Sequence, residues 1–263
     1  MGMWNRRGFL SGLAAASVSA TAWAGPRPVV RRDFVLCLDP GHGGDNDGCH
    51  SADGSVVEKD VTLQTALALQ AAVLHKLPHV QVVLTREADR SCTLADRVAF
   101  ANAAGADAFI SLHTNASESK SQHGFETYVL DARASSLEAA RTARRENDEG
   151  LAEPGTAAEG AEVATMLRQL EMAEQRLAAG RFAKSIQAHQ RSAFPDRADR
   201  GVRQAPFDVL MGARMPAVLF ESGFLDHEGE GALLTSDTGM NKVVGGLADA
   251  VVDLYRLHAR TRA

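Results

Sequence analysis

The first part of the chain alternates between short apolar runs and longer segments whose apolar residues recur every three or four positions. The segments 58–78 and 94–104 have the helical spacing, and Pro78 ends the first of them. Continuous apolar runs are typical of strands buried on both faces of a sheet. Such runs lie at 34–39, 80–85, 108–113 and 126–130. Alternating strands and helices predict an α/β fold: a single domain with a mostly parallel twisted sheet and helices on both faces.

The segment 131–186 interrupts this alternation, because it has no strand pattern. It is rich in Ala, Glu and Arg, contains a Pro154-Gly155 break, and carries a helical apolar stripe in its second part. We therefore expect a helical insertion. The alternation then resumes with predicted strands at 209–211 and 217–221 and a closing helix at 243–257.

The N-terminus predicts an export signal. Arg6 and Arg7 precede a short apolar run that ends in an A-x-A sequence at Ala24, and the run is too short to span a membrane. Twin arginines are similar to a twin-arginine export signal, and the alternatives are an ordinary secretory signal or an uncleaved anchor. We expect a signal peptide at 1–24, a linker at 25–33 and a catalytic domain at 34–263. This predicts a periplasmic protein without stable membrane insertion after cleavage.

Composition and charge narrow the set of partners. The chain has 263 residues, 45% hydrophobic and 23% charged, which is ordinary for one globular domain with a full core. Removal of 1–24 takes away two arginines and no acid, so the net charge moves from −5 to −7. We expect no nucleic-acid partner, because such binding depends on clustered positive charge. We take a monomer as the default.

The three cysteines do not form a zinc set, because the sequence has no C-x-x-C pair. In an oxidising compartment the alternatives are three free thiols or one disulfide. Cys49 and Cys92 are the candidates for that disulfide, because Cys37 lies in a predicted strand.

Half of a metal site is visible at the first strand. His42 lies in the glycine-rich loop after that strand, and Glu58 begins the first predicted helix. A catalytic zinc needs three protein ligands and one position for water, and His113, at the end of the third strand, is the best third ligand. In an open α/β sheet such residues converge outside the carboxyl ends of the strands. We predict one zinc ion per chain, with His50 and His123 as rival ligands.

Glu221 ends the last predicted strand, in Val218-Leu-Phe-Glu-Ser-Gly-Phe224. A carboxylate in a buried strand is costly unless it has a partner or a function. A water activated by a metal needs a group that takes its proton and returns it to a leaving amine. Glu221 is the predicted catalytic carboxylate, and a salt-bridged strand end is the alternative. Asn115 is a candidate for substrate binding, or else a turn residue.

Six short motifs follow one another along the chain: Asp39-Pro-Gly-His-Gly-Gly44, Glu58-Lys-Asp-Val61, Leu84-Thr-Arg86, Ser111-Leu-His-Thr-Asn-Ala116, Gly124-Phe-Glu-Thr127 and Leu219-Phe-Glu-Ser-Gly-Phe224. Together they resemble the zinc-dependent N-acetylmuramoyl-L-alanine amidases of bacterial cell-wall remodelling. The resemblance implies that His42, Glu58 and His113 bind Zn²⁺ and that Glu221 is catalytic. It also implies hydrolysis of the amide between the lactyl group of N-acetylmuramic acid and L-alanine in peptidoglycan. The alternatives are a zinc peptidase cutting within the stem peptide and a wall-binding module without activity.

The segment 131–186 resembles the helical insertion of periplasmic septal members of this family. In those proteins a helix covers the zinc cleft until a LytM-type activator moves it. The resemblance implies a regulatory insertion over the active-site cleft and an autoinhibited enzyme that acts in daughter-cell separation. A glutamate of the insertion is expected at the open zinc position, with Glu162 as first candidate and Glu149, Glu153 and Glu159 as rivals. A packed surface helix is the alternative.

Overall fold

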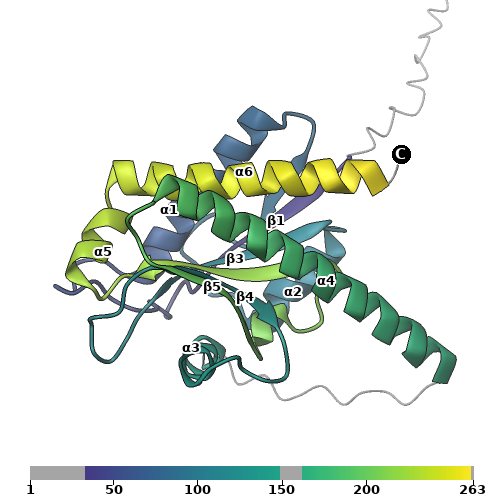
Figure 1. Cartoon of the computed structure of the whole chain (residues 1–263), viewed down its shortest axis with the longest axis horizontal. Helices are drawn as coiled ribbons and strands as arrows, with labels where there is room; N and C mark the ends of the chain where they lie inside the picture. Colours follow the sequence, from purple (N-terminus) through teal and green to yellow (C-terminus); the bar gives the residue numbers. More distant parts are fainter. Residues whose placement is uncertain (1–32, 149–161, 262–263) are drawn as a thin grey trace, which may run out of the picture. The chain divides into compact units, whose positions relative to one another are not determined.

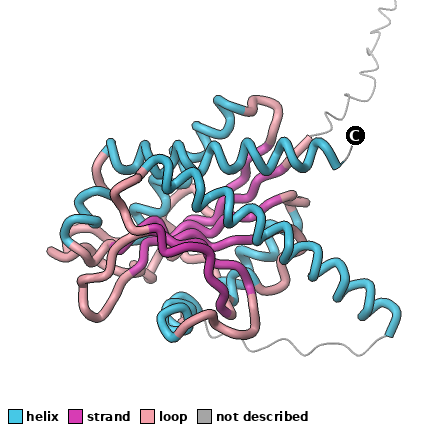
Figure 2. Tube along the Cα trace, in the orientation of Figure 1, coloured by secondary structure: helices cyan, strands magenta, loops and turns pink. Residues whose placement is uncertain are grey.

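A six-stranded sheet forms the centre of the fold in this computed structural model, which describes residues 33–148 and 162–261 (Figures 1 and 2). The strand order is β2-β1-β3-β6-β4-β5. The first four of these strands pair in parallel, whereas β4 runs antiparallel to β6 and parallel to β5. The predicted mostly parallel sheet is confirmed. The strands are β1 (Val35–Pro40), β2 (Gln81–Leu84), β3 (Ala108–Asn115), β4 (Phe125–Leu130), β5 (Asp199–Ala205) and β6 (Ala217–Phe224).

Helices cover both faces of this sheet, as predicted. One face packs against α1, α4 and α6 through one apolar cluster, and the other face packs against α2, α3 and the short 3-10 helix η1 through a second cluster. Figure 1 shows α4 and α6 on one side of the sheet and α3, seen end-on, on the other. The helices are α1 (Glu58–Lys76), α2 (Leu94–Ala103), α3 (Leu137–Asn147), α4 (Glu162–Ala193), η1 (Asp208–Leu210), α5 (Glu228–Leu234) and α6 (Asp237–Thr261).

The apolar runs of the sequence account for the central strands, because every residue of β1, β3 and β6 is buried. Leu69 and Val73 of α1 and Leu247 and Val251 of α6 are buried at helical spacing against the same face. Within the described residues, no helix is both long enough and apolar enough to cross a membrane.

Some expectations about the second half of the chain were wrong. The segment predicted as a strand at 209–211 lies in η1, a single turn followed by extended backbone at Met211. A strand does occur earlier, at β5, but its sequence Asp-Arg-Gly-Val-Arg-Gln-Ala is polar because β5 is an edge strand. The predicted insertion at 131–186 also includes part of the core, since Phe182 and Ile186 of α4 are buried in the first apolar cluster.

Candidate metal centre

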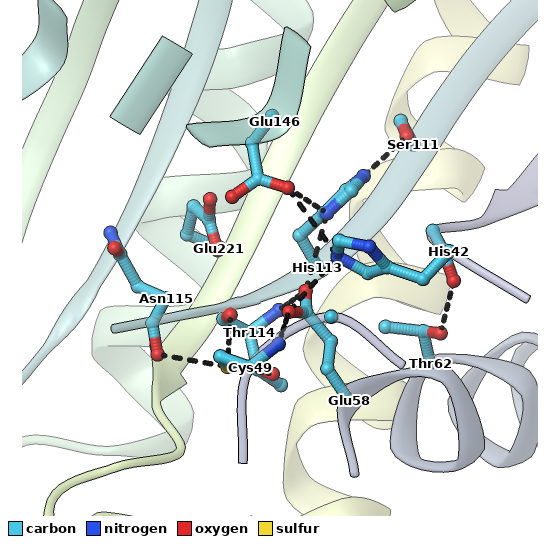
Figure 3. A network of polar contacts seen from close by, with 12 residues as sticks. His42, Cys49, Glu58, Thr62, Ser111, His113, Thr114, Asn115, Glu146 and Glu221 are labelled. Atoms are coloured by element: carbon cyan, nitrogen blue, oxygen red, sulfur yellow. Dashed lines mark hydrogen bonds and ion pairs between the residues drawn. The ribbon is translucent and has the colours of Figure 1, made fainter. Parts of the chain in front are cut away.

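Three adjacent strands deliver functional side chains to one edge of the sheet. His42 follows β1, His113 lies near the end of β3, and Glu221 lies opposite His113 in the register of β3 with β6. Glu58 is the first residue of α1 and joins them from the loop side. The carboxyl ends of parallel strands meet at one rim, so the expected convergence of these four residues occurs in the structure (Figure 3).

Glycines allow the two histidines to approach each other. A Cβ atom on Gly41 would lie 2.4 Å from the ring of His113, and one on Gly48 would lie 2.7 Å from both Glu58 and His42. His42 itself has a φ of 61°, in the left-handed region that few non-glycine residues adopt. The centroids of the His42 and His113 rings are 5.0 Å apart. The glycines of this loop therefore leave the space in which His42, Glu58 and His113 come together.

The nitrogen atoms of both histidines face the Glu58 carboxylate. His42 Nε2 is 3.0 Å from Glu58 Oε2, and His113 Nδ1 is 3.2 Å from Glu58 Oε1. The other ring nitrogens have outer partners: His42 Nδ1 lies 3.2 Å from Asn46 Oδ1, and His113 Nε2 lies 3.1 Å from Ser111 Oγ. Outer hydrogen bonds of this kind orient metal-binding histidines.

The sequence did not identify the fourth member of the cluster, Glu146 of α3. Its Oε2 atom lies 3.0 Å from His113 Nδ1 and 3.4 Å from His42 Nε2. One ligand atom each from His42, Glu58, His113 and Glu146 lies within 4.8 Å of all the others, and all four residues are buried. Glu146 follows two arginines in the sequence, which resembles a solvated helix face and gives no signal of burial.

This cluster fits a divalent metal ion of the zinc type. His113 Nδ1 lies 3.0 Å from Glu146 Oε2 and 3.2 Å from Glu58 Oε1, and all three side chains are buried. Ligand atoms of two histidines and two glutamates thus converge on one buried point, as atoms that share a cation do. Two imidazole nitrogens and two carboxylates are a donor set that zinc accepts.

Charges in the cluster lower the pKa values of two of its glutamates and raise that of a histidine. Burial alone would raise the pKa of Glu58 and Glu146, but it is outweighed by the charge of His42 beside Glu58 and by those of His113 and Arg145 beside Glu146, and both pKa values are lowered. Burial would also lower the pKa of His113, but the Glu146 carboxylate raises it to about 10. The two carboxylates are therefore ionised and can face a cation.

Glu221 has a different environment. Burial, followed by the charge of Glu146, raises the pKa of Glu221 well above its ordinary value. Both of its carboxylate oxygens are buried and make no hydrogen bond within the described chain, and Arg145 Nη2 is 3.8 Å from Oε1. Figure 3 shows Glu221 beside Glu146. A buried carboxyl group with a raised pKa next to a metal centre is suited to taking up and releasing a proton.

The remaining candidates lie outside the cluster. His50 is half exposed, with Nε2 3.9 Å from Asp47, and His123 is exposed beside the ring of His227. All three cysteines are free, so of the two alternatives the structure has three thiols and not a Cys49–Cys92 disulfide. The thiol of Cys49 instead donates a hydrogen bond to the carbonyl of Thr114, 3.2 Å away.

Asn115 is buried next to the cluster, where its Nδ2 atom donates to Glu126 at 2.6 Å and its Oδ1 atom accepts from Arg145 at 3.0 Å. Its substrate role stays a prediction. Glu149, Glu153 and Glu159 lie outside the described residues, as does the side chain of Glu162, although α4 begins at that residue. For these residues the expected contact with the metal site stays a prediction.

A sequence model of the family described as N-acetylmuramoyl-L-alanine amidase matches residues 36–253. The chain belongs to this amidase family. It is 32% identical over 228 residues to the N-acetylmuramoyl-L-alanine amidase CwlM of Bacillus licheniformis, an alignment that covers 87% of this chain and 71% of that protein. It is 31% identical to the N-acetylmuramoyl-L-alanine amidase AmiA of Escherichia coli, with 84% and 76% of the two chains covered.

Solved structures agree with this assignment. The catalytic domain of the amidase CwlV from Bacillus (Paenibacillus) polymyxa superimposes with a TM-score of 0.62 at 28% identity, covering 84% of this chain and 97% of that one. An amidase from Clostridium difficile 630 gives 0.64 at 26% identity, with 84% and 96% covered. The single α/β domain is thus the fold of amidase catalytic domains, and the chain is a cell-wall amidase of this family.

Proposed function

We propose that this amidase is zinc-dependent and that it hydrolyses the bond between the lactyl group of N-acetylmuramic acid and L-alanine in peptidoglycan. One observation carries the proposal: His42, Glu58 and His113 direct ligand atoms to one point, and Glu221 lies beside that point with a raised pKa. The family match and the names of the aligned amidases support the choice of bond.

Each residue has a distinct task in this proposal. Zinc, when bound to His42, Glu58 and His113, would polarise the scissile carbonyl and lower the pKa of a water molecule. Glu221 takes a proton from the attacking water and gives it to the nitrogen of the departing L-alanine. The raised pKa of Glu221 favours holding this proton between its uptake from water and its delivery to nitrogen. Asn115, two residues beyond His113, is placed to contact the substrate once Arg145 has left it.

We also propose that the structure represents an autoinhibited state, with Glu146 in the position that the substrate carbonyl and water would take. Arg145 supports this contact: it donates to Glu146 Oε1 at 2.8 Å and to the carbonyl of Ala116 at 2.8 Å. The apolar residues that α3 buries are Ala139 and Ala143, so little apolar surface holds the helix in place. A LytM-type activator would release α3.

The proposed setting is the periplasm, where the exported chain would act in cell-wall remodelling and daughter-cell separation. The signal at 1–24 supports export by the twin-arginine route, and the resemblance to septal amidases supports the role. Both residues that we consider for autoinhibition belong to the segment 131–186, Glu146 from its contact with the cluster and Glu162 from the sequence.

Digestion of purified peptidoglycan tests these proposals. We expect the Glu146→Ala variant to release intact stem peptides with a free L-alanine amino terminus, faster than the unchanged chain does, and a chelator to abolish this release. Mass spectrometry identifies the products. Glu174→Ala, at an exposed position of α4, is the matched control and should behave as the unchanged chain.

Other products would lead to other conclusions. Shortened peptides still attached to muramic acid would show a peptidase instead of an amidase. If Glu146→Ala leaves the basal rate unchanged while Glu162→Ala raises it, the blocking residue is Glu162. Equal rates for all four proteins would contradict autoinhibition by either residue.

A further inference from the structure

Two arginines of β5, Arg200 and Arg203, form a charged cluster beside α3. Arg200 Nε and Arg203 Nε lie 2.9 and 2.8 Å from the same oxygen, Oε2 of Glu126. Glu126 is buried in β4, where its other oxygen accepts from Asn115 and from the hydroxyl of Tyr128. Glu126 therefore neutralises one of the two guanidinium charges and fixes both side chains.

The second negative charge for these arginines comes from α3. Glu138 Oε2 lies 3.2 Å from Arg200 Nη2 and 3.3 Å from Arg203 Nη1. Arg203 Nη1 also donates to Ser136 Oγ, the side chain that caps the start of α3. Glu138 is 48% exposed, whereas Glu126 is 1% exposed, so Glu138 is the removable partner of the pair. If α3 leaves, two arginines face only one carboxylate.

A groove runs from this cluster to Asn115 and Arg145, and Arg145 Nη2 lies 2.8 Å from Glu146 and 3.8 Å from Glu221. The groove encloses about 720 Å³, and Asn115, Glu126, Glu138, Arg145, Arg200 and Phe224 line it. Glu126 lies opposite Glu221 in the register of β4 with β6, so the arginines of β5 lie two strands beyond Glu221. A substrate that extends from Glu221 past Arg145 and along this groove would reach Arg200.

We propose that Arg200 and Arg203 bind a carboxylate of the stem peptide, and that Glu138 occupies this subsite from α3. The inference rests on the proposed function. Arginine pairs recognise carboxylates through charge-assisted hydrogen bonds, and the observed contacts of Glu138 are of this kind. In this arrangement α3 imitates the substrate at two points, with Glu146 at the scissile bond and Glu138 at the peptide carboxylate.

The spacing of the two glutamates agrees with a short peptide. Glu138 and Glu146 are separated by eight positions of α3, which corresponds to about 12 Å along a helix axis. An extended chain covers this distance in roughly three to four residues. A stem peptide carries carboxylates on its second and third residues, and the two are tested separately as sources of the bound group.

The test measures kcat and KM for soluble muramoyl tripeptides, with the Glu146→Ala chain as the parent protein. Three substrates are compared: one with all carboxylates free, one amidated at the α-carboxylate of the second residue, and one amidated at the C-terminus of the third. We expect one amidation to raise KM by roughly tenfold or more, the effect of losing a hydrogen bond between charged groups. The amidation that does so identifies the bound carboxylate.

Arg203→Gln, added to the parent, should remove this difference between substrates by raising KM for the free-acid substrate. Arg200 remains paired with Glu126 in that variant, so the buried carboxylate keeps a cation. Glu138→Gln tests the same subsite without altering either arginine and should lower KM for the free-acid substrate more than for the amidated ones. The matched control is Arg191→Gln, because Arg191 also pairs with an acid of β5, 3.3 Å from Asp199, but is 61% exposed on α4.

Two negative results have different meanings. Hydrolysis of all three substrates with equal KM, or a preference that persists in Arg203→Gln, would overturn the carboxylate subsite alone. Failure of the parent to release any free L-alanine amino terminus from the three substrates would overturn the proposed function, and the subsite with it. A loss of preference in Arg191→Gln equal to that in Arg203→Gln would also overturn the subsite, because it would show a general effect of charge.

Discussion

The orientation of His113 depends on a chain of buried hydrogen bonds, and its removal should weaken metal binding. Ser111 Oγ donates to Asp39 Oδ2 at 2.7 Å and lies 3.1 Å from His113 Nε2. Because the serine proton points to Asp39, the remaining lone pairs of Oγ accept the proton on Nε2. With Nε2 holding a proton toward Ser111, Nδ1 is the atom that faces the cluster and that would bind a metal after losing its own proton. The perturbation that tests this is Ser111→Ala.

The structure sets the expected size of the effect. Loss of an outer hydrogen bond to a ligating histidine weakens metal affinity by about 10- to 100-fold, which corresponds to about 1.4–2.8 kcal/mol. Asp39 keeps its hydrogen bonds from Thr85 and from Arg97 Nη1, the latter at 2.8 Å, so the variant should still fold. We expect a loss of stability of about 1 kcal/mol, the net contribution of one hydrogen bond.

The assay is competition for Zn²⁺ between the purified chain and a chromophoric chelator. Ser222→Ala is the matched control: Ser222 is also buried and also bonds to His113, but its hydroxyl donates to the backbone carbonyl at 3.2 Å. It should lose similar stability and keep its zinc affinity. Unchanged affinity in Ser111→Ala, or an equal loss in both variants, would refute the reasoning.

Three further predictions concern other parts of the site. Glu221→Gln should keep its zinc content and lower kcat on peptidoglycan by at least about 100-fold, measured as stem-peptide release, because proton transfer is lost. Gly41→Ala should lower zinc affinity in the same chelator competition, since the new methyl group would lie 2.4 Å from the His113 ring. Burial alone would raise the pKa of Asp39, but Arg97 and the hydroxyls of Thr85 and Ser111 lower it below 3.8. The ionised carboxylate therefore stabilises the fold above pH 3.8, and this contribution is lost as the pH falls further. Asp39→Asn should therefore cost about 3 kcal/mol in urea unfolding at pH 7, and the difference from the unchanged chain should shrink at pH 3.

Residues at the ends of predicted elements could be placed from the sequence. His42, His113 and Glu221 each follow or end an apolar run, and the topology of a parallel sheet brings such ends together whatever their separation along the chain. The register of β3 with β6 places His113 opposite Glu221, as this topology predicts. Glu58 could be placed from the sequence for a similar reason, because it begins a helix with a clear apolar period.

Other features depend on contacts that the local sequence does not reveal. β5 lies at the edge of the sheet and carries charged side chains, so its sequence contains no apolar run that would predict a strand. Glu146 is buried because α3 packs beside the two histidines, and it directly follows two arginines in the sequence. The free thiols of Cys49 and Cys92 likewise depend on tertiary neighbours, such as the carbonyl of Thr114 beside Cys49.

The composition of α3 agrees with a blocking element that must also be removable. A helix held by a wide apolar face would need a partner able to replace several kcal/mol of burial. The apolar side chains that α3 buries are two alanines, and its other contacts are polar: Glu138 with the arginines of β5, and Arg145 and Glu146 with the metal centre. The Glu138 contacts lie near the surface, where ion pairs contribute about 0–1 kcal/mol each, so a partner that competes for them would loosen this end of α3. The buried contacts of Glu146 would need a replacement at the metal centre. A substrate with its own carboxylate would compete at the Glu138 contact, which couples release of α3 to occupation of the groove.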